Sequence, residues 1–184
     1  AEAYFYNKLI SKDEVRRAVS TMEEVAAEHP KDSYNHQVLI DMYNQVSDVD
    51  PENFLKKAER EAEIALSLSP NRQEVYFSLS KTKYIEGKVG EAFEILKRTI
   101  ELNDKVPDAH FYYGLLAFEN HEPEIGYQEI KKALALGRKW KRYHEPRVVG
   151  NYFADSGYLP EAIELYKKAL ALEPNDLDAR MNLG

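Results

Sequence analysis

Cysteine is absent from this sequence of 184 residues. Its absence excludes a disulfide framework, cysteine-based zinc sites and thiol catalysis, although it leaves the cellular compartment open. Basic residues are also outnumbered, with 25 Lys and Arg against 32 Asp and Glu and a formal net charge of -7. Because general nucleic-acid binding requires a basic surface, we expect no nucleic-acid partner.

Long apolar runs are missing as well. A membrane-spanning helix needs roughly 18 or more consecutive apolar residues, and a signal peptide needs a shorter apolar run behind a basic start. Neither pattern occurs in this sequence, so we expect that these residues do not insert into a membrane.

The residue patterns of catalytic and metal sites are also absent. The sequence contains no H-E-x-x-H pair, no glycine-rich phosphate loop behind a strand and no recognisable Ser-His-Asp arrangement. The tripeptides His121-Glu122-Pro123 and His144-Glu145-Pro146 look alike but fall at different places of the repeat described next. We therefore predict a protein that is not an enzyme, with no cofactor and no metal site.

Small residues recur at an interval near 34 residues. Ser80, Gly114, Gly150 and Gly184 are separated by 34, 36 and 34 positions. A second row of small residues and a row of leucines run in step with it at intervals of 34, 34 and 36: Ala58, Ala92, Gly126 and Ala162, and Leu68, Leu102, Leu136 and Leu172. Such self-similarity predicts one helix-turn-helix repeat that is stacked several times. Gly or Ala at each helix crossing lets two backbones approach closely.

Apolar residues follow helical periodicity, and no convincing strand alternation occurs. In 161–173, Ala162, Tyr166 and Ala169 share one face, whereas Glu164 and Lys168 form an i,i+4 pair on the other. The sequence therefore predicts an all-α protein with about ten helices. The expected pairs are 33–46/52–68, 73–86/90–103, 108–120/123–136 and 146–156/160–173, with another pair before them and a short helix at 177–184.

Prolines and glycines support these boundaries. All eight prolines fall where predicted helices begin or end, because Pro lacks the N–H that a helix interior needs. Gly87 and Gly157 fall in tight turns, where a positive φ is easily adopted. His36 and His110 fall inside first helices, at a position where we expect a packed imidazole.

These positions resemble the tetratricopeptide repeat (TPR) family. The best matches are Val149-Gly150, Phe153, Ala162, Tyr166 and Glu173-Pro174-Asn175. The resemblance implies a single TPR-type helix-turn-helix solenoid over 1–184, coiled into a right-handed superhelix. Its repeats are 1–32 (partial), 33–72, 73–106, 107–142, 143–176 and 177–184 (partial).

The two ends of the chain fall inside repeats, so we expect a fragment of a longer protein. We expect residues 177–184 to dock against 161–173, because Leu177, Met181 and Leu183 need apolar cover. Residues 62–79 are also similar to the repeat tail of bacterial O-antigen-ligase-like membrane proteins. This second resemblance implies the soluble, extramembrane tail of a bacterial membrane protein, but the localisation is otherwise unknown.

Two repeats are longer than the others. The repeat 33–72 has roughly six extra residues around 47–53, which are either a tolerated surface insertion with a helix cap at Asp50 or an acidic contact loop. A shorter insertion lies in the basic segment Arg138, Lys139, Trp140, Lys141 and Arg142. These basic residues either offset the dipole of the preceding helix, with Trp140 packed into the turn, or contact a phosphate, an anionic lipid or an acidic peptide.

The TPR resemblance implies a concave surface formed by first helices, which usually holds a peptide. Its predicted residues are Tyr34, Gln37, Asp41 and Asn44, then Phe77, Lys81 and Tyr84, then Phe111, Leu115 and Phe118, then His144, Arg147, Asn151 and Asp155. We expect a peptide-binding groove with polar ends and an apolar, aromatic centre, in which Phe111, Leu115 and Phe118 are exposed anchors. Helix packing is the other explanation for these aromatic residues.

The predicted function is that of a scaffold for protein–protein interaction, whose partner is a protein or peptide. One alternative is a structural role, in which exposed repeat ends form homo-oligomers. Another alternative is an accessory module of a larger membrane-anchored bacterial protein, for example a glycan polymerase or ligase.

Overall fold

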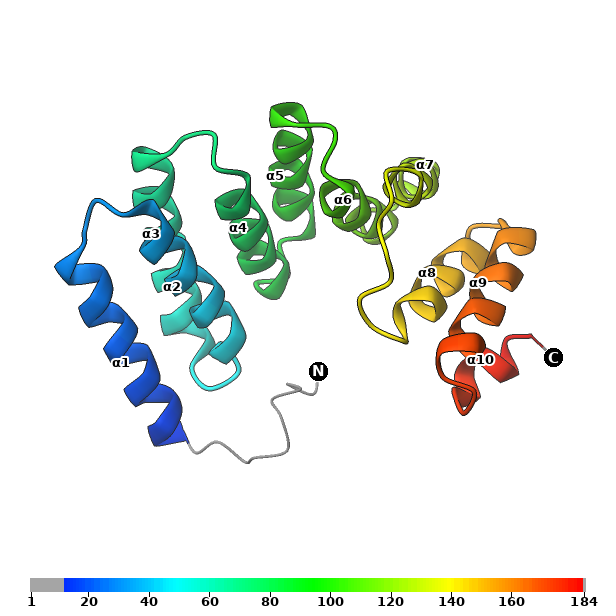
Figure 1. Cartoon of the computed structure of the whole chain (residues 1–184), viewed down its shortest axis with the longest axis horizontal. Helices are drawn as coiled ribbons and strands as arrows, with labels where there is room; N and C mark the ends of the chain where they lie inside the picture. Colours follow the sequence, from blue (N-terminus) through cyan, green and yellow to red (C-terminus); the bar gives the residue numbers. More distant parts are fainter. Residues whose placement is uncertain (1–11, 184) are drawn as a thin grey trace. The chain divides into compact units, whose positions relative to one another are not determined.

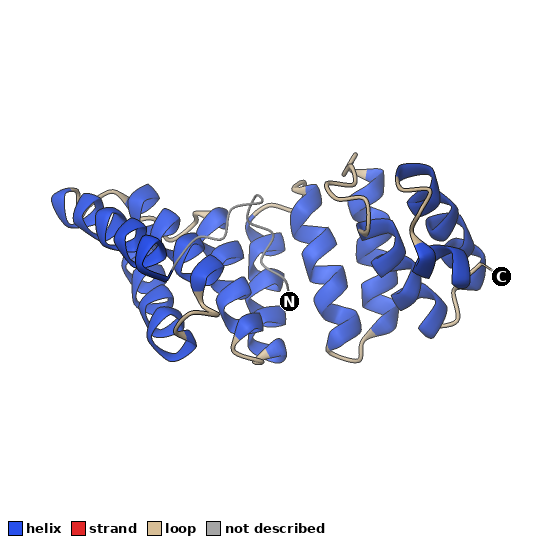
Figure 2. Ribbon diagram, turned by 90° about the horizontal axis from the view of Figure 1, so that it is seen from below, coloured by secondary structure: helices blue, strands red, loops and turns tan. Residues whose placement is uncertain are grey.

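The computed structural model describes residues 12–183, and these residues contain ten helices and no strand (Figure 2). The helices are α1 (Lys12–Glu28), α2 (Ser33–Val46), α3 (Pro51–Leu68), α4 (Gln73–Ile85), α5 (Val89–Leu102), α6 (Pro107–Glu119), α7 (Pro123–Ala135), α8 (Glu145–Asp155), α9 (Leu159–Leu172) and α10 (Leu177–Met181). The all-α prediction is confirmed. Every helix of the four predicted pairs is present, with ends within one residue of the predicted positions.

The chain forms two compact units, Ala1–Asn103 (unit 1) and Asp104–Gly184 (unit 2). In unit 1, α2 forms an antiparallel hairpin with α3, and α4 forms one with α5 (Figure 1). In unit 2, α6 pairs with α7 and α8 with α9. Helix α1 packs on α2, and the helix expected before α1 would fall on residues outside the described part. The right-handed superhelix over the whole chain stays a prediction.

The rows of small residues lie where paired helices approach each other. Ala58, Ala92 and Ala162 are buried at these crossings. A Cβ atom placed on Gly114 would lie 3.0 Å from the carbonyl oxygen of Gly126. Contacts this short leave no room for a methyl group, so the 34-residue period has a steric cause.

A side chain near the start of several first helices closes the preceding connection. The residue at the fourth helical position donates a hydrogen bond to the carbonyl oxygen six residues earlier in four repeats: His36 to Pro30 (3.0 Å), Tyr76 to Pro70 (2.8 Å), His110 to Asp104 (2.7 Å) and Arg180 to Pro174 (2.6 Å). His36 and His110 also pair with a glutamate of the following helix, Glu61 and Glu129. Both imidazoles are buried, which confirms that they are packed inside the fold.

The tight turns inside the repeats use a left-handed residue. Gly87 has a φ of 76° and Gly157 a φ of 88°, as expected. The equivalent residue between α6 and α7 is His121, whose φ is 62°. A side chain with a Cβ atom is strained in this region, so His121 is an unfavourable residue for its turn.

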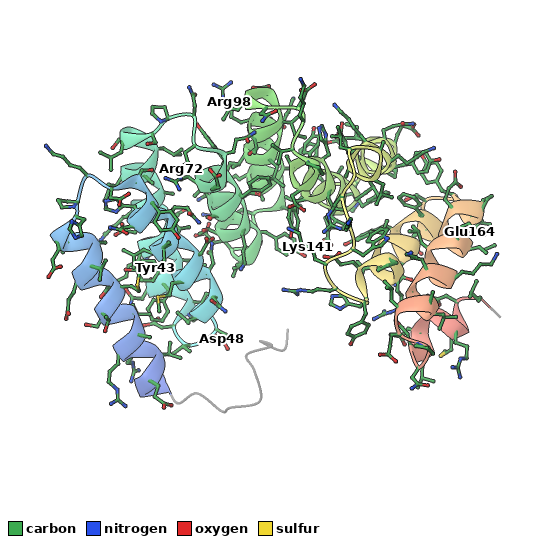
Figure 3. The ribbon with its side chains drawn as sticks, viewed as in Figure 1. Tyr43, Asp48, Arg72, Arg98, Lys141 and Glu164 are labelled. Atoms are coloured by element: carbon green, nitrogen blue, oxygen red, sulfur yellow. The ribbon has the colours of Figure 1, made fainter. Side chains whose placement is uncertain are left out.

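The insertion in the first full repeat lengthens a helix rather than forming a long loop. Helix α3 begins at Pro51 and has 18 residues, and only a short turn around Asp48 separates it from α2 (Figure 3). Asp50 occupies the N-cap position, but its side chain makes no cap hydrogen bond. The predicted cap position at Asp50 is therefore confirmed, but without a side-chain hydrogen bond. Side-chain caps are found instead at Asp32 and Asp176.

The C-terminal helix docks on its neighbour as expected, but two of the three residues expected to be covered are exposed. Helix α10 packs on α9, and the fully buried Ala179 lies at this contact. Leu177 and Met181 remain 66% and 78% exposed, so the expectation that they are covered is wrong. Leu183 packs against the core of unit 2 as expected. The side chain of Arg147 also pairs with Asp176 at 3.0 Å, which fastens the start of α10.

Candidate protein-binding surface

Helix α4 carries the part of the predicted surface that is open to solvent. Phe77, Lys81 and Tyr84 follow each other at i, i+4 and i+7, so they share one face of the helix. Tyr84 is 45% exposed, Lys81 is exposed and Phe77 is partly buried. Ile85, the residue after Tyr84, is also exposed. This face combines aromatic area with a positive charge.

Helix α2 lies beside α4 and contributes polar groups. The hydroxyl of Ser78 donates to Asp41 at 2.5 Å, and the Nδ2 group of Asn44 donates to the carbonyl oxygen of Ser78 at 2.8 Å. These bonds fix α2 against α4. The Oδ1 atom of Asn44 is buried and has no hydrogen-bond partner. Gln37 bonds to Asp41, so Asp41 is already satisfied within the protein.

The start of α2 adds a second exposed aromatic ring. Tyr34 is exposed, and the guanidinium carbon of Arg72 lies 5.4 Å from the centre of its ring. Arg72 precedes α4, as Figure 3 shows. The surface formed by Tyr34, Asp41, Phe77, Lys81 and Tyr84 is called the α2–α4 surface below.

The aromatic residues predicted for the centre of the groove are buried in unit 2. Phe111 is 1% exposed and Phe118 is 9% exposed, which corrects the expectation that they are open anchors. The Phe111 ring is covered by Arg138, whose guanidinium carbon lies 3.3 Å from the ring centre, and by the edge of Trp140. The Phe118 ring stacks on Tyr152 with the ring centres 5.1 Å apart. Leu115 is partly buried beside them.

Steric contact explains why Phe118 is enclosed. A Cβ atom on Gly126 would lie 2.6 Å from the Phe118 ring, so the ring fills the space that this glycine leaves. Packing, the alternative explanation for these aromatic residues, therefore describes Phe111 and Phe118. Their positions in the repeat are the same as those of Phe77 and Tyr84, but their neighbours differ.

Arg147 and Asn151 are engaged within the protein. The Nε group of Arg147 lies 3.0 Å from Asp176, and its Nη1 group lies 3.1 Å from Asp178. The Oδ1 atom of Asn151 accepts hydrogen bonds from Tyr166 and Asn182. The predicted polar end of the groove thus holds α10 in place, while Asp155 is exposed and His144 is partly buried.

The basic segment between α7 and α8 divides into packed and exposed residues. Arg138 is buried between Asp108 and Glu145, with Nε 3.2 Å from Asp108 and Nη1 3.1 Å from Glu145. Lys141 pairs with Asp108 at 2.7 Å, and its position beside α8 is visible in Figure 3. Lys139 and Arg142 are exposed.

The charge of Glu145 is stabilised by this arrangement. Burial raises the pKa of Glu145, but hydrogen bonds from the Arg138 side chain and the Lys141 backbone lower it more, so the net pKa lies below its usual value. Glu145 is therefore ionised at neutral pH and balances the buried guanidinium.

Tyrosine–glutamate pairs join α7 to α9, and the sequence analysis missed them. The Tyr127 hydroxyl donates to Glu161 and the Tyr158 hydroxyl to Glu124, each at 2.5 Å. The two rings stack 3.9 Å apart. Each pair is separated by 34 residues, which is close to the repeat interval. A tyrosine and a glutamate 34 positions apart are the sequence signal that could have revealed these contacts.

No metal site or membrane helix is present in the described residues. Within residues 12–183, acidic and histidine side chains form no group of three or more that could hold a metal ion. Every helix in the same range is too short or too polar to cross a bilayer.

Comparisons with known proteins agree with this architecture. Residues 150–184 match the family model of the TPR repeat. Among solved structures, YrrB, described as a TPR protein with an unusual peptide-binding site, superposes with a TM-score of 0.69 at 18% identity, over 90% of this chain and 81% of that one. The fold is therefore an all-α helical repeat of the TPR type. TPR proteins are generally non-enzymatic scaffolds for protein–protein interaction.

Two curated relatives match a longer part of the chain than the family model does. The mouse protein O-mannosyl-transferase TMTC1 is 24% identical over 126 residues, which cover 65% of this chain and 13% of the relative. The human tetratricopeptide repeat protein 13 is 28% identical over 124 residues, which cover 65% of this chain and 14% of the relative. The matched part thus spans only about one seventh of these relatives.

Proposed function

We propose that this protein is a non-enzymatic scaffold that binds a peptide or protein segment on the α2–α4 surface. The observation that carries the proposal is the single face of α4 on which Tyr84 and Lys81 are exposed beside Phe77. Rigid aromatic side chains supply contact area at low entropic cost, and a nearby lysine selects the charge of the partner. Helical grooves of this kind commonly hold an extended or helical peptide through apolar anchors.

The chemistry of the surface defines the expected ligand. An apolar or aromatic side chain of the ligand would pack against Tyr84 and Phe77, and burial of one such side chain contributes about 1.5–3 kcal/mol. An acidic residue of the ligand would face Lys81 and would affect the association rate more than the affinity. Asp41 is bonded to Gln37 and Ser78, so it is expected to orient the helices rather than the ligand. The peptide-binding site reported for YrrB supports a peptide ligand by analogy of fold.

A peptide selection tests the proposal. The full chain would be screened against a random library of displayed dodecapeptides, and the enriched sequence would be titrated by calorimetry. Tyr84→Ala should weaken its binding about tenfold or more, because 1.4 kcal/mol corresponds to a factor of ten. Tyr143→Ala removes an equally exposed tyrosine outside the surface and should leave the affinity unchanged. A selection without enrichment, or a peptide that binds Tyr84→Ala as tightly as the wild type, would contradict the proposal.

A second candidate function is that of an accessory or structural module in a larger protein. The specific observation in its favour is the match to a part of TMTC1, which is named as an O-mannosyl-transferase. In that case the helical repeats would join copies of the parent protein or pack on its other domains. Light scattering separates the two functions, since a structural module forms oligomers with rising concentration and a receptor stays monomeric.

A further inference from the structure

The connection between α7 and α8 packs onto unit 2 through the kinds of contact that a bound peptide would make. Residues 138–142 place a guanidinium on the face of the Phe111 ring and pack an indole in a T-shaped arrangement with the same ring. Asp108 and Glu145 flank the guanidinium from two different helices. Two hydrogen bonds to Glu145, at 3.1 and 3.2 Å, form the paired contact that arginine makes with a carboxylate. The segment thus supplies a partner for the Phe111 ring and for both carboxylates.

The remainder of the segment is more open to solvent. Lys139 and Arg142 are exposed, and residues 138–142 form no helix or strand. Gly137, at the start of the connection, has a φ of 90° and nothing within 4 Å of a built Cβ atom. The side chains that fasten the segment are therefore those of Arg138, Trp140 and Lys141.

Unit 1 offers a comparison in which the same position is open. Phe77 corresponds to Phe111 in the repeat but is only partly buried, and the residue at the register of Arg138 is Asp104 in that repeat. An aspartate cannot bridge two carboxylates. The covering of Phe111 thus comes from the basic segment and not from the helix packing that both repeats share.

We infer that Asp108, Phe111 and Glu145 form a seat for an arginine next to an aromatic residue, which Arg138 and Trp140 occupy in cis. The segment 138–142 is then a strap that closes the first-helix face of α6 until a partner with the same basic, aromatic chemistry replaces it. A guanidinium suits the seat because it stacks on an aromatic ring and forks between carboxylates at once. The seat lies within unit 2 and is independent of the α2–α4 surface.

The strap should compete strongly with any partner. A segment attached at both ends has an effective concentration on the order of millimolar, so a free peptide of similar chemistry cannot displace it at low concentration. Removal of the two anchoring side chains should expose the seat while Asp108 and Glu145 remain. Lys141 still neutralises Asp108 in that variant.

A peptide copy of the strap tests the inference. The probe is a fluorescein-labelled synthetic peptide with the sequence of residues 137–143, and the proteins are the full chain and Arg138→Ala/Trp140→Ala. The variant should bind the probe at least tenfold more tightly than the wild type, and a probe with alanine in place of its first arginine and its tryptophan should not bind. Lys139→Ala/Arg142→Ala is the matched control and should behave as the wild type. Addition of Glu145→Gln to the open variant should abolish the gain.

The opposite results would overturn the inference. A variant that keeps its helical signal but binds the probe no better than the wild type shows that Arg138 and Trp140 only pack. Binding that survives Glu145→Gln shows that the seat is not the site. If the double variant unfolds, the wild type provides the measurement, since Trp140 is its only tryptophan. A probe that keeps its arginines but has phenylalanine in place of its tryptophan should, at millimolar concentration, shift Trp140 emission to longer wavelength, and unchanged emission contradicts a strap.

Discussion

Equivalent residues of different repeats have different surroundings in this protein. Phe77 and Phe111 occupy the same position of a first helix, yet Phe77 is partly exposed and Phe111 is covered by Arg138. The sequence period predicts that both lie on first helices. It does not predict their exposure, because the covering residues belong to an insertion that interrupts the period. Phe118 is buried for a different reason, since Tyr152 of the neighbouring helix α8 stacks on its ring.

Truncation of Phe118 should reduce stability rather than binding. Phe118→Ala removes a ring that fills the space beside Gly126, so we expect a loss of about 3–5 kcal/mol in the free energy of unfolding. Urea denaturation followed by circular dichroism measures it. The matched variant Tyr84→Ala, at the same position of an earlier repeat, should cost far less because its ring is 45% exposed. Equal losses in both variants would show that Phe118 is not a core residue.

His121 is a residue whose replacement should stabilise the protein. Its φ of 62° is left-handed, and glycine occupies the same turn position at Gly87 and Gly157. His121→Gly should therefore raise the free energy of unfolding by about 1 kcal/mol, the cost of a side chain in this region. Gly157→Ala is the converse variant and should lower it by a similar amount. Thermal unfolding of both variants checks the prediction, which an unchanged or lower midpoint for His121→Gly contradicts.

At the scale of elements, the helices and their ends were predictable, but the side-chain contacts at some of these ends were not. Proline and glycine fix where a helix can begin or stop, which is why the pairs agree with the sequence prediction within one residue. Asp50 occupies the predicted N-cap position, but its side chain makes no hydrogen bond to the first turn, which the residue type alone does not reveal. The exposed Leu177 and Met181 show that a short helix can dock by a small residue, Ala179, without covering its larger ones.

Contacts between helices were the least predictable feature at this scale. The pairs Tyr127–Glu161 and Tyr158–Glu124 join α7 to α9, although an aromatic or acidic residue alone gives no indication of its partner. The charged pair Lys57–Glu23 joins α3 to α1 at the same 34-residue separation. Side-chain pairing between repeats therefore depends on the identity of both residues. The helical pattern does not determine either identity.

The hydrogen bond between Tyr158 and Glu124 predicts a dependence of stability on alkaline pH. This bond raises the pKa of Tyr158 from 10.0 to about 12. A group whose folded pKa is raised stabilises the fold fully below its unfolded pKa. That contribution is lost as the pH rises from about 10 to about 12. Wild-type stability should therefore fall over this range.

Two variants isolate that contribution. Tyr158→Phe removes the titrating group, so the fall of stability between pH 10 and 12 should be shallower than in the wild type. Glu124→Gln keeps the tyrosine but removes the charge that disfavours its ionisation, and it should have the same effect on the slope. Chemical denaturation at a series of pH values measures it. If neither variant changed the slope of stability against pH, the Tyr158–Glu124 pair would not titrate as described.

At the scale of the whole molecule, the repeat pattern predicts the scaffold but not the partner that it binds. The residues that keep the period are small or apolar and serve the packing of the helix pairs. The residues that would recognise a ligand lie outside the period and differ between repeats, as Lys81 and Leu115 do at one position. The sequence could therefore predict the TPR-type fold and first-helix residues as candidates. It could not predict that unit 2 covers its aromatic residues while α4 leaves its own accessible.

The central claim is that a peptide binds the α2–α4 surface, and hydrogen–deuterium exchange tests it most directly. A peptide obtained by selection on the full chain would be added at saturating concentration, and amide protection would be compared with and without it. Protection should increase in Ser33–Val46 and Gln73–Ile85 and should vanish for Tyr84→Ala. Protection confined to Asp104–Gly184, or protection that Tyr84→Ala leaves intact, would contradict the account.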